Sequence, residues 1–157
     1  MRKLTLTIAI ALALPALAAA ADLAAGDGSL GVSSANATIV VQGQGVIYGH
    51  FDSGTLLVLQ YKPDDGTSVP AISGGKTKLT RNGTGAVTGS DVRFLFPSGR
   101  YTVQLIASDI NASAVGKGTI VGNGFGTPDD GSFSVNGGKP EQLAAKGATS
   151  DSFGKAS

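Results

Sequence analysis

The side chains best suited to catalysis lie in one short stretch around the single histidine, His50. Asp52 and Ser53 follow it closely, so a base, a carboxylate and a hydroxyl nucleophile are all present. Their spacing does not suit a catalytic triad, because neighbouring residues of a strand and a turn do not point at one another. The G-x-S-x-G elbow of serine hydrolases is also absent. We therefore interpret His50 as a surface or rim histidine and predict no catalytic residue.

Metal and cofactor chemistry is equally poorly supported. Asp64-Asp65-Gly66 and Asp129-Asp130-Gly131 offer oxygen atoms to Ca²⁺, but they lack the alternating acidic ladder and distal glutamate of an EF-hand loop. Solvated turns are the better interpretation. Glu141 is the only glutamate, and no tryptophan is present to hold a sugar ring. Gly43 to Gly49 has the wrong spacing for a dinucleotide-binding loop. We predict no metal, no cofactor and no enzymatic activity.

The first 21 residues have the pattern of a signal peptide. Arg2 and Lys3 form a basic start, Leu4 to Leu17 is apolar, and Ala19 to Ala21 places small residues at a cleavage site. The apolar run is shorter than the roughly 20 residues needed to span a bilayer, and Pro15 interrupts it. The sequence therefore predicts export with a mature chain beginning at Asp22, and no transmembrane segment in that chain.

The composition limits the partners and the chemistry of the exported chain. Cysteine is absent, which excludes disulfides, a lipid-modified amino terminus and thiolate metal sites. Loss of Arg2 and Lys3 leaves 10 basic against 11 acidic residues, a formal charge of −1. This balance gives no electrostatic basis for binding nucleic acid. About 136 mature residues suffice for one domain that buries a core without disulfides.

The stretch Val92 to Ile106 carries the clearest strand signal. Apolar and polar residues alternate on both sides of Pro97-Ser98-Gly99, which predicts a β-hairpin with Phe94 pointing into the core and Arg93 to solvent. Phe96, beside the turn, is expected to be partly wet. Thr55 to Tyr61 has apolar residues on both faces, which predicts a strand buried on both sides; a short buried helix is the alternative, disfavoured by the turn-rich flanks and the lack of a helix cap.

Turn signals divide the rest of the chain into similar short runs. The clearest turns are Asp52-Ser53-Gly54, Pro63-Asp64-Asp65-Gly66 and Asn82-Gly83, the last being a hairpin signal. We predict one all-β domain, residues 22–138, folded as an antiparallel sandwich or barrel of about eight to ten short strands; a β-solenoid is the alternative. Residues 139–157 have no strand period and are predicted to form a flexible tail.

Two internal similarities suggest how strands meet. D-G-S-apolar-x-V occurs at 27–32 and at 130–135, so the first and last strands of the domain are expected to lie side by side. G-x-G-x-I-x-G occurs at 43–49 and at 116–122. Because strand side chains alternate, these glycines share a face, where a ring such as Phe94 or Tyr101 can approach the backbone.

The series DGSLGV, GQGVIYGHFDSGTLLV, DVRFLFPSGRYTVQLIASDINASAVGKGTI and DGSFSVNGG resembles a group of small exported glycine-rich all-β bacterial proteins. The resemblance covers about Asp27 to Gly138. It implies a shared β fold and export to the cell envelope or the extracellular space, and it implies no particular activity.

The sequence thus predicts an exported, non-catalytic β protein of the bacterial envelope, periplasm or extracellular space. A binding module with an unidentified envelope or extracellular ligand is the first interpretation. A structural, self-assembling surface protein is the alternative, because edge strands can pair between chains. The sequence does not indicate the ligand or the oligomeric state.

Overall fold

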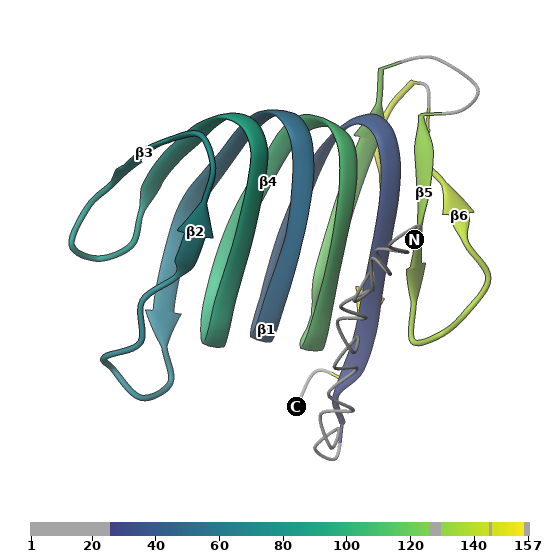
Figure 1. The fold of residues 1–157 in the computed structure, drawn as a ribbon. Helices are drawn as coiled ribbons and strands as arrows, with labels where there is room; N and C mark the ends of the chain where they lie inside the picture. Colours follow the sequence, from purple (N-terminus) through teal and green to yellow (C-terminus); the bar gives the residue numbers. More distant parts are fainter. Residues whose placement is uncertain (1–25, 126–129, 145, 156–157) are drawn as a thin grey trace, which may run out of the picture.

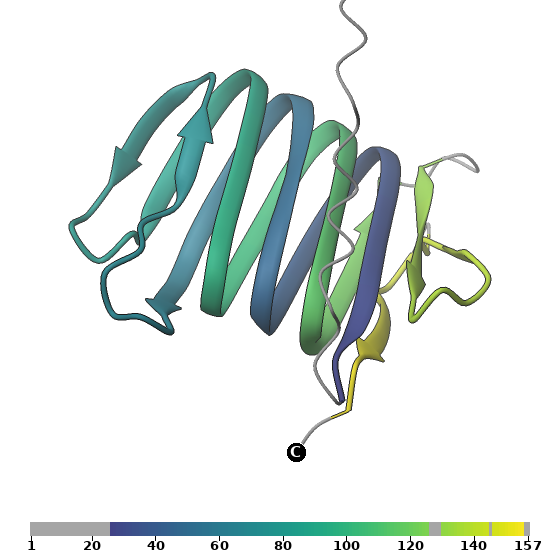
Figure 2. The same ribbon diagram turned by 60° about the horizontal axis from the view of Figure 1, so that its bottom comes forward.

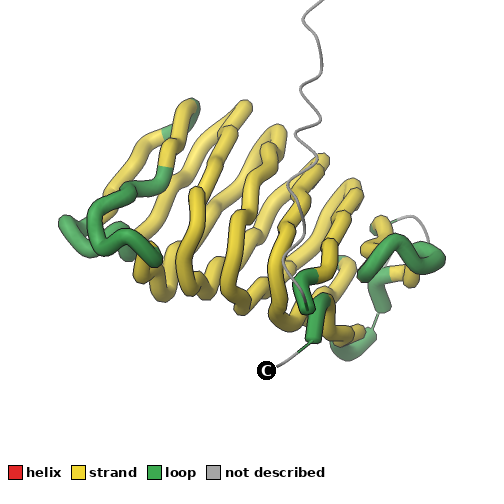
Figure 3. The backbone as a smooth tube through the Cα atoms, turned by 90° about the horizontal axis from the view of Figure 1, so that it is seen from below, coloured by secondary structure: helices red, strands yellow, loops and turns green. Residues whose placement is uncertain are grey.

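A computed structural model describes residues 26–125, 130–144 and 146–155. The predicted signal peptide and cleavage site lie outside these residues. The described chain forms strands and no helix, which confirms the all-β prediction (Figure 3). The strands make one antiparallel sheet that is not closed into a barrel. They are β1 (Gly28–Pro63), β2 (Ala71–Ser73), β3 (Lys76–Leu79), β4 (Gly85–Gly124), β5 (Gly131–Val135), β6 (Glu141–Gln142) and β7 (Thr149–Phe153).

Two very long strands, β1 and β4, wind around a common axis and form most of the molecule (Figure 1). Each pairs with the other along both of its edges: Gly45, for example, pairs with Gly99 on one side and with Gly116 on the other. The two partners lie 17 residues apart in β4, which is one turn of the coil. The coil in Figure 2 is therefore one continuous sheet folded into two facing layers, and successive segments of β1 and β4 lie alternately in the first layer and in the second.

The first layer contains the segments 28–34, 110–116, 46–51 and 92–96, in that order, between β5 with β6 at one end and β2 at the other. The second layer contains five neighbouring segments between β7 and β3. No charged residue occurs in these five segments. We call their outward side the uncharged face, and its segments, in order, are 118–124, 37–43, 101–107, 54–60 and 85–89.

The long strands bend at two corners where they cross between layers. At the glycine corner, Gly45, Gly99 and Gly116 have φ values of 132°, 156° and 137°. A Cβ on Gly45 would lie 2.1 Å from the Val115 carbonyl oxygen, because neighbouring backbones approach closely there. At the aspartate corner, Asp91 and Asp109 have φ values near 50°, and Ser53, next to Asp52, pairs with their neighbours Ser90 and Ser108. Aspartate tolerates this left-handed conformation better than most residues.

These corners correct the predicted hairpin at Val92 to Ile106. β4 continues without interruption through Pro97-Ser98-Gly99, and both halves pair with β1 and not with each other. Asp52-Ser53-Gly54 is likewise inside β1. Turn residues mark a change of direction, but they do not distinguish a reversal from a bend between layers. The short strands expected from the sequence are consequently joined into two long ones.

Side chains that point between the layers form the core. Phe94 is buried and Arg93 is exposed, which confirms the predicted register of this segment. Phe96 is fully buried and not partly wet, since the bend carries it inward against Tyr61 and Phe94 at ring distances of 5.4 and 6.2 Å. The Tyr101 ring lies against Gly43, as the shared glycine face predicts.

The start of β1 pairs with β5, from Leu30–Val135 to Ser34–Gly131. This confirms that the two D-G-S stretches begin neighbouring strands. The glycines of the other similarity, at Gly43 and Gly118, also pair directly.

The carboxyl-terminal segment corrects the predicted flexible tail. β6 pairs with β5, and β7 pairs with residues 118–122 of β4. Leu143 is 6% exposed and Phe153 1% exposed. The segment escapes a periodicity search because it is mostly polar and attaches through backbone hydrogen bonds and two isolated apolar side chains. It closes one end of the core.

Replacement of Phe153 by alanine tests this closure. Truncation of a buried phenylalanine typically costs about 3–5 kcal/mol, so the free energy of unfolding of Phe153→Ala should fall by that amount in denaturant melts. Ser152→Ala, at the exposed neighbouring position, should melt like the wild type. Equal stability of the two variants would mean that the segment does not pack as described.

Replacement of Gly116 by alanine tests the glycine corner. A Cβ at this position would lie 2.1 Å from the Gln44 carbonyl oxygen at an unfavourable φ, so the cost should exceed about 1 kcal/mol. Gly31→Ala is the matched control, because its Cβ would have only an ordinary contact, 3.4 Å from the Ser134 hydroxyl. Thermal melts in which Gly31→Ala is the less stable variant would contradict the bend at Gly116.

Candidate functional site

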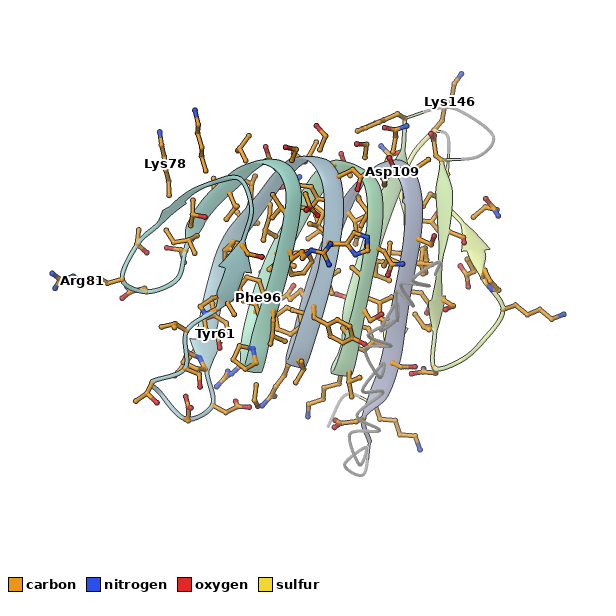
Figure 4. The ribbon with its side chains drawn as sticks, viewed as in Figure 1. Tyr61, Lys78, Arg81, Phe96, Asp109 and Lys146 are labelled. Atoms are coloured by element: carbon orange, nitrogen blue, oxygen red, sulfur yellow. The ribbon has the colours of Figure 1, made fainter. Side chains whose placement is uncertain are left out.

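A hollow of about 330 Å³ lies at the end of the coil where β1 finishes. Two loops enclose it: one follows β1 and the other joins β3 to β4. Figure 4 shows Tyr61 in the interior beside Phe96, and Arg81 at the tip of the second loop, pointing away from the body. We call this hollow the end pocket, and it is lined by Tyr61, Lys62, Pro63, Gly66, Thr67, Ser68, Val69, Pro70, Arg81, Asn82 and Gly83.

The first wall is the turn predicted at Pro63-Asp64-Asp65-Gly66, closed by a hydrogen bond from the Gly66 N–H to the Pro63 carbonyl at 3.2 Å. The Asp65 carboxylate accepts hydrogen bonds from the Thr67 N–H at 2.9 Å and the Ser68 N–H at 2.8 Å. The Ser68 hydroxyl donates a third at 2.5 Å. Chiefly through this hydroxyl, and then through the N–H groups of Ser68 and Thr67, the pKa of Asp65 is lowered to about 2.

The same wall is fastened to the glycine corner. The Ser98 hydroxyl donates to the Asp64 carboxylate at 2.5 Å, and the Asp64 N–H donates to the Ser98 carbonyl at 3.4 Å. Both acidic side chains of the turn are thus engaged in holding the loop. The loop is preorganised, which lowers the entropic cost of binding a ligand.

The second wall is the hairpin predicted at Asn82-Gly83, where β3 pairs with the start of β4. The Thr80 N–H donates to the Thr84 carbonyl at 2.8 Å, and the Gly83 N–H donates to the Thr80 carbonyl at 2.9 Å. The hydroxyls of Thr80 and Thr84 are also 2.8 Å apart. Gly83 lies over the Tyr61 ring, since a Cβ there would be 3.3 Å from its Cδ1 atom.

Tyr61 forms the floor of the end pocket and is 8% exposed. Its hydroxyl is buried and has no hydrogen-bond partner among the described residues. Burial raises the pKa of Tyr61, and the charges of Asp65 and Asp64 raise it further. The group is therefore a neutral O–H donor at ordinary pH. The Tyr101 hydroxyl is also without a partner, but it lies within the core against Gly43.

The charged side chains that line the end pocket are two exposed cations, Lys62 and Arg81. Within the described residues the ion pair present joins Arg93 to Asp91 at 3.4 Å, remote from both cations in the sheet. Pro63, Pro70 and Val69 add apolar surface. The pocket is thus bordered by the Tyr61 ring, two exposed cations, the Asn82 amide and an apolar wall, and the Tyr61 hydroxyl is enclosed beneath its floor.

The residues singled out from the sequence do not join this site. His50 is half-buried on the first layer, in register with Arg93 and Asn111. Ser53 pairs with Ser90 and Ser108 at the aspartate corner. In the described part of the chain no group of three His, Cys, Asp or Glu residues is placed to hold a metal ion.

Of the two acidic turns, only the first is solvated as predicted. Asp130 is buried, and its carbonyl accepts hydrogen bonds from the Ser34 hydroxyl and the Asn36 N–H. Asp129 lies outside the described residues. Glu141 is exposed on β6.

Sequence reasoning missed Tyr61 as the floor of a pocket. The signal available was an aromatic residue at the end of an apolar run, directly before Lys62 and a Pro-Asp-Asp-Gly turn. That pattern also fits an ordinary strand end. The pocket depends on how close the loop at 64–70 comes to the hairpin turn at 80–84, which no local pattern specifies.

No protein-family model, no curated protein and no solved structure matches the chain. Within the residues described, no helix has the length and hydrophobicity needed to cross a membrane.

Replacement of Asp65 tests how the first wall is held. Because the folded pKa is lowered from 3.8, the carboxylate's hydrogen bonds are fully present above pH 3.8 and are lost as pH falls through about 2. The amide resonances of Thr67 and Ser68 should titrate in NMR spectra with a midpoint near pH 2. Asp65→Ala should abolish this titration and speed amide exchange in the loop, with little change in melting temperature.

Asp65→Asn is the matched control. It retains one oxygen acceptor and loses the charge, so amide protection should persist in part while the titration disappears. A wild-type midpoint near 3.8 would contradict the hydrogen bonding described for this turn.

Proposed function

We propose that this protein is an exported, non-catalytic binding module whose end pocket takes a small acidic, hydroxyl-bearing ligand, such as an acidic sugar unit. The unpartnered hydroxyl of Tyr61 carries the proposal. A buried polar group without a partner costs about 1–3 kcal/mol, and a ligand oxygen that reaches this enclosed hydroxyl as the two loops part would recover that cost. Ligand pockets are typically lined by apolar and aromatic side chains with a few placed polar groups.

The charged groups that line the end pocket favour an anion. Asp64 and Asp65 lie nearby and remain charged, but they do not line the pocket, and their oxygens accept hydrogen bonds from Ser98, Ser68 and Thr67. Lys62 and Arg81 have no such partner among the described residues. A ligand carboxylate near Lys62 would gain a charge-assisted hydrogen bond. The Asn82 amide and the Ser68 hydroxyl would suit hydroxyl groups on the same ligand.

The composition of the lining supports binding over catalysis. The lining residues include no carboxylate and no imidazole, the groups that most often act as general acid or base at neutral pH. Export is proposed from the signal-peptide pattern of residues 1–21 and from the resemblance to small exported β proteins. The periplasm, the envelope or the extracellular space is then the expected location.

Glucuronate and glucose are matched probes, because they share a ring and differ in one carboxylate. Isothermal titration should detect glucuronate binding that is stronger than glucose binding. Tyr61→Phe should weaken glucuronate binding about fivefold, equivalent to about 1 kcal/mol, without lowering the melting temperature, because it removes only an unpartnered hydroxyl. Lys62→Gln should weaken it about tenfold.

Lys78→Gln is the control for charge, since Lys78 is an exposed cation on β3 that does not line the pocket. It should bind glucuronate like the wild type. Glucuronate binding that is absent, or unaffected by Tyr61→Phe and Lys62→Gln, would overturn the proposal.

A further inference from the structure

The uncharged face is a broad part of the surface, and binding at the end pocket does not account for it. Its five neighbouring segments contain no charged residue, and outward side chains such as Ile106 and Val121 are 39% and 40% exposed. Polar but neutral side chains, including Gln104 and Thr102, lie between them in register. The centres of protein–protein interfaces are similarly depleted of charge, with charged residues confined to the rim.

Opposite charges border the uncharged face along the two sides where its strands reach the corners. At the glycine corner, Lys62 and Arg100 pair in register, and Gln44 pairs with both Arg100 and Lys117. Asp52, Asp91 and Asp109 lie at the aspartate corner. Asp64 also lies at the glycine corner and Asp91 is paired with Arg93, so the first rim is basic and the second acidic in net charge.

We propose that the uncharged face binds a second copy of this chain, with a two-fold axis parallel to the axis of the coil. Such an axis places each segment of the uncharged face opposite the same segment of the second subunit. The two copies of the segment then run in opposite directions. The acidic rim of each subunit then meets the basic rim of its partner, twice per dimer. A two-fold axis along the strands would instead place acid on acid and base on base. The arrangement is self-complementary, as an isologous interface requires.

The size of the surface is adequate for a modest interface. Five strands spaced about 4.8 Å apart, each with about seven residues rising about 3.3 Å, cover roughly 550 Å² per subunit. The total of roughly 1,100 Å² just exceeds the approximately 1,000 Å² expected of a biological interface. A weak, concentration-dependent dimer is the expected result.

The ends of the sheet favour association through this face over association through strand edges. The outermost strands β2, β3, β6 and β7 have 3, 4, 2 and 5 residues, too few for an extended ladder between chains. Lys76 and Lys78 lie on β3, where the proposed axis would bring like charges together. They therefore mark the limit of the contact at that end.

Sedimentation velocity of the purified full protein over a range of concentrations tests the proposal. The wild type should show a monomer–dimer equilibrium that weakens in high salt. Gln104→Arg, at the centre of the uncharged face, should raise the dissociation constant at least about tenfold, because it buries an unpaired charge. Ser113→Arg is the matched control: it lies outward on the first layer between Gly31 and Tyr48, and should dimerise like the wild type.

A charge swap tests the direction of the axis. Arg100 and Asp109 lie at opposite corners of the central segment, so each should face the other residue across the dimer. Asp109→Lys and Arg100→Glu should each weaken the dimer, and the double variant should return to within about twofold of the wild type. A strictly monomeric wild type, dimerisation of Gln104→Arg like that of the wild type, or failure of the double variant to recover would each overturn the proposal.

Discussion

The pairing of β1 with β4 along both edges of each strand is the constraint on which the rest of the structure depends. It satisfies the backbone groups of every central segment without a closed barrel and without a disulfide. It also fixes where the chain must bend, because partners on the two sides of a residue are 17 or 18 residues apart. Residues with positive φ occur at the two corners, where the chain bends once in each layer-to-layer crossing of this 17- or 18-residue repeat. Close backbone approaches at Gly45 and Gly116 lie where adjacent turns bend together.

A coil of this kind leaves its two ends open, and the remaining elements close them. β5, β6 and β7 cover one end, where Leu143 and Phe153 complete the core. β2, β3 and the two braced loops cover the other, and there the closure is incomplete. Tyr61 is the last inward-pointing ring of β1, and its hydroxyl has no hydrogen-bond partner within the described part of the chain. The end pocket is thus a consequence of ending the coil with loops, which is why the candidate site occurs there.

Much of the fold could be predicted from local patterns. Alternation placed Phe94 inside and Arg93 outside, Asn82-Gly83 marked a true hairpin, and the D-G-S similarity identified neighbouring strands. Pro97-Ser98-Gly99 was misinterpreted because a bend and a reversal use the same residues. Thr55 to Tyr61 was expected to be buried on both faces, yet Leu59 is 56% exposed. Its outward side belongs to the uncharged face, and apolar residues on a solvent-facing sheet imitate a doubly buried strand. The end pocket joins loops distant in sequence, so no local pattern could predict it.

The distribution of charge is consistent with the coil. Exposed uncharged strands are normally a hazard, because their free edges can pair with other chains. Here the five segments of the uncharged face have a neighbour on each side within the molecule, so they need no charge for protection. Three of the four outermost strands do carry charge, with Lys76 and Lys78 on β3, Glu141 on β6 and Asp151 on β7. Charge is thus placed where pairing must be prevented, and it is absent where a broad face is free to make contact. A sheet that protects its edges in this way can interact through its faces without risk of uncontrolled strand addition.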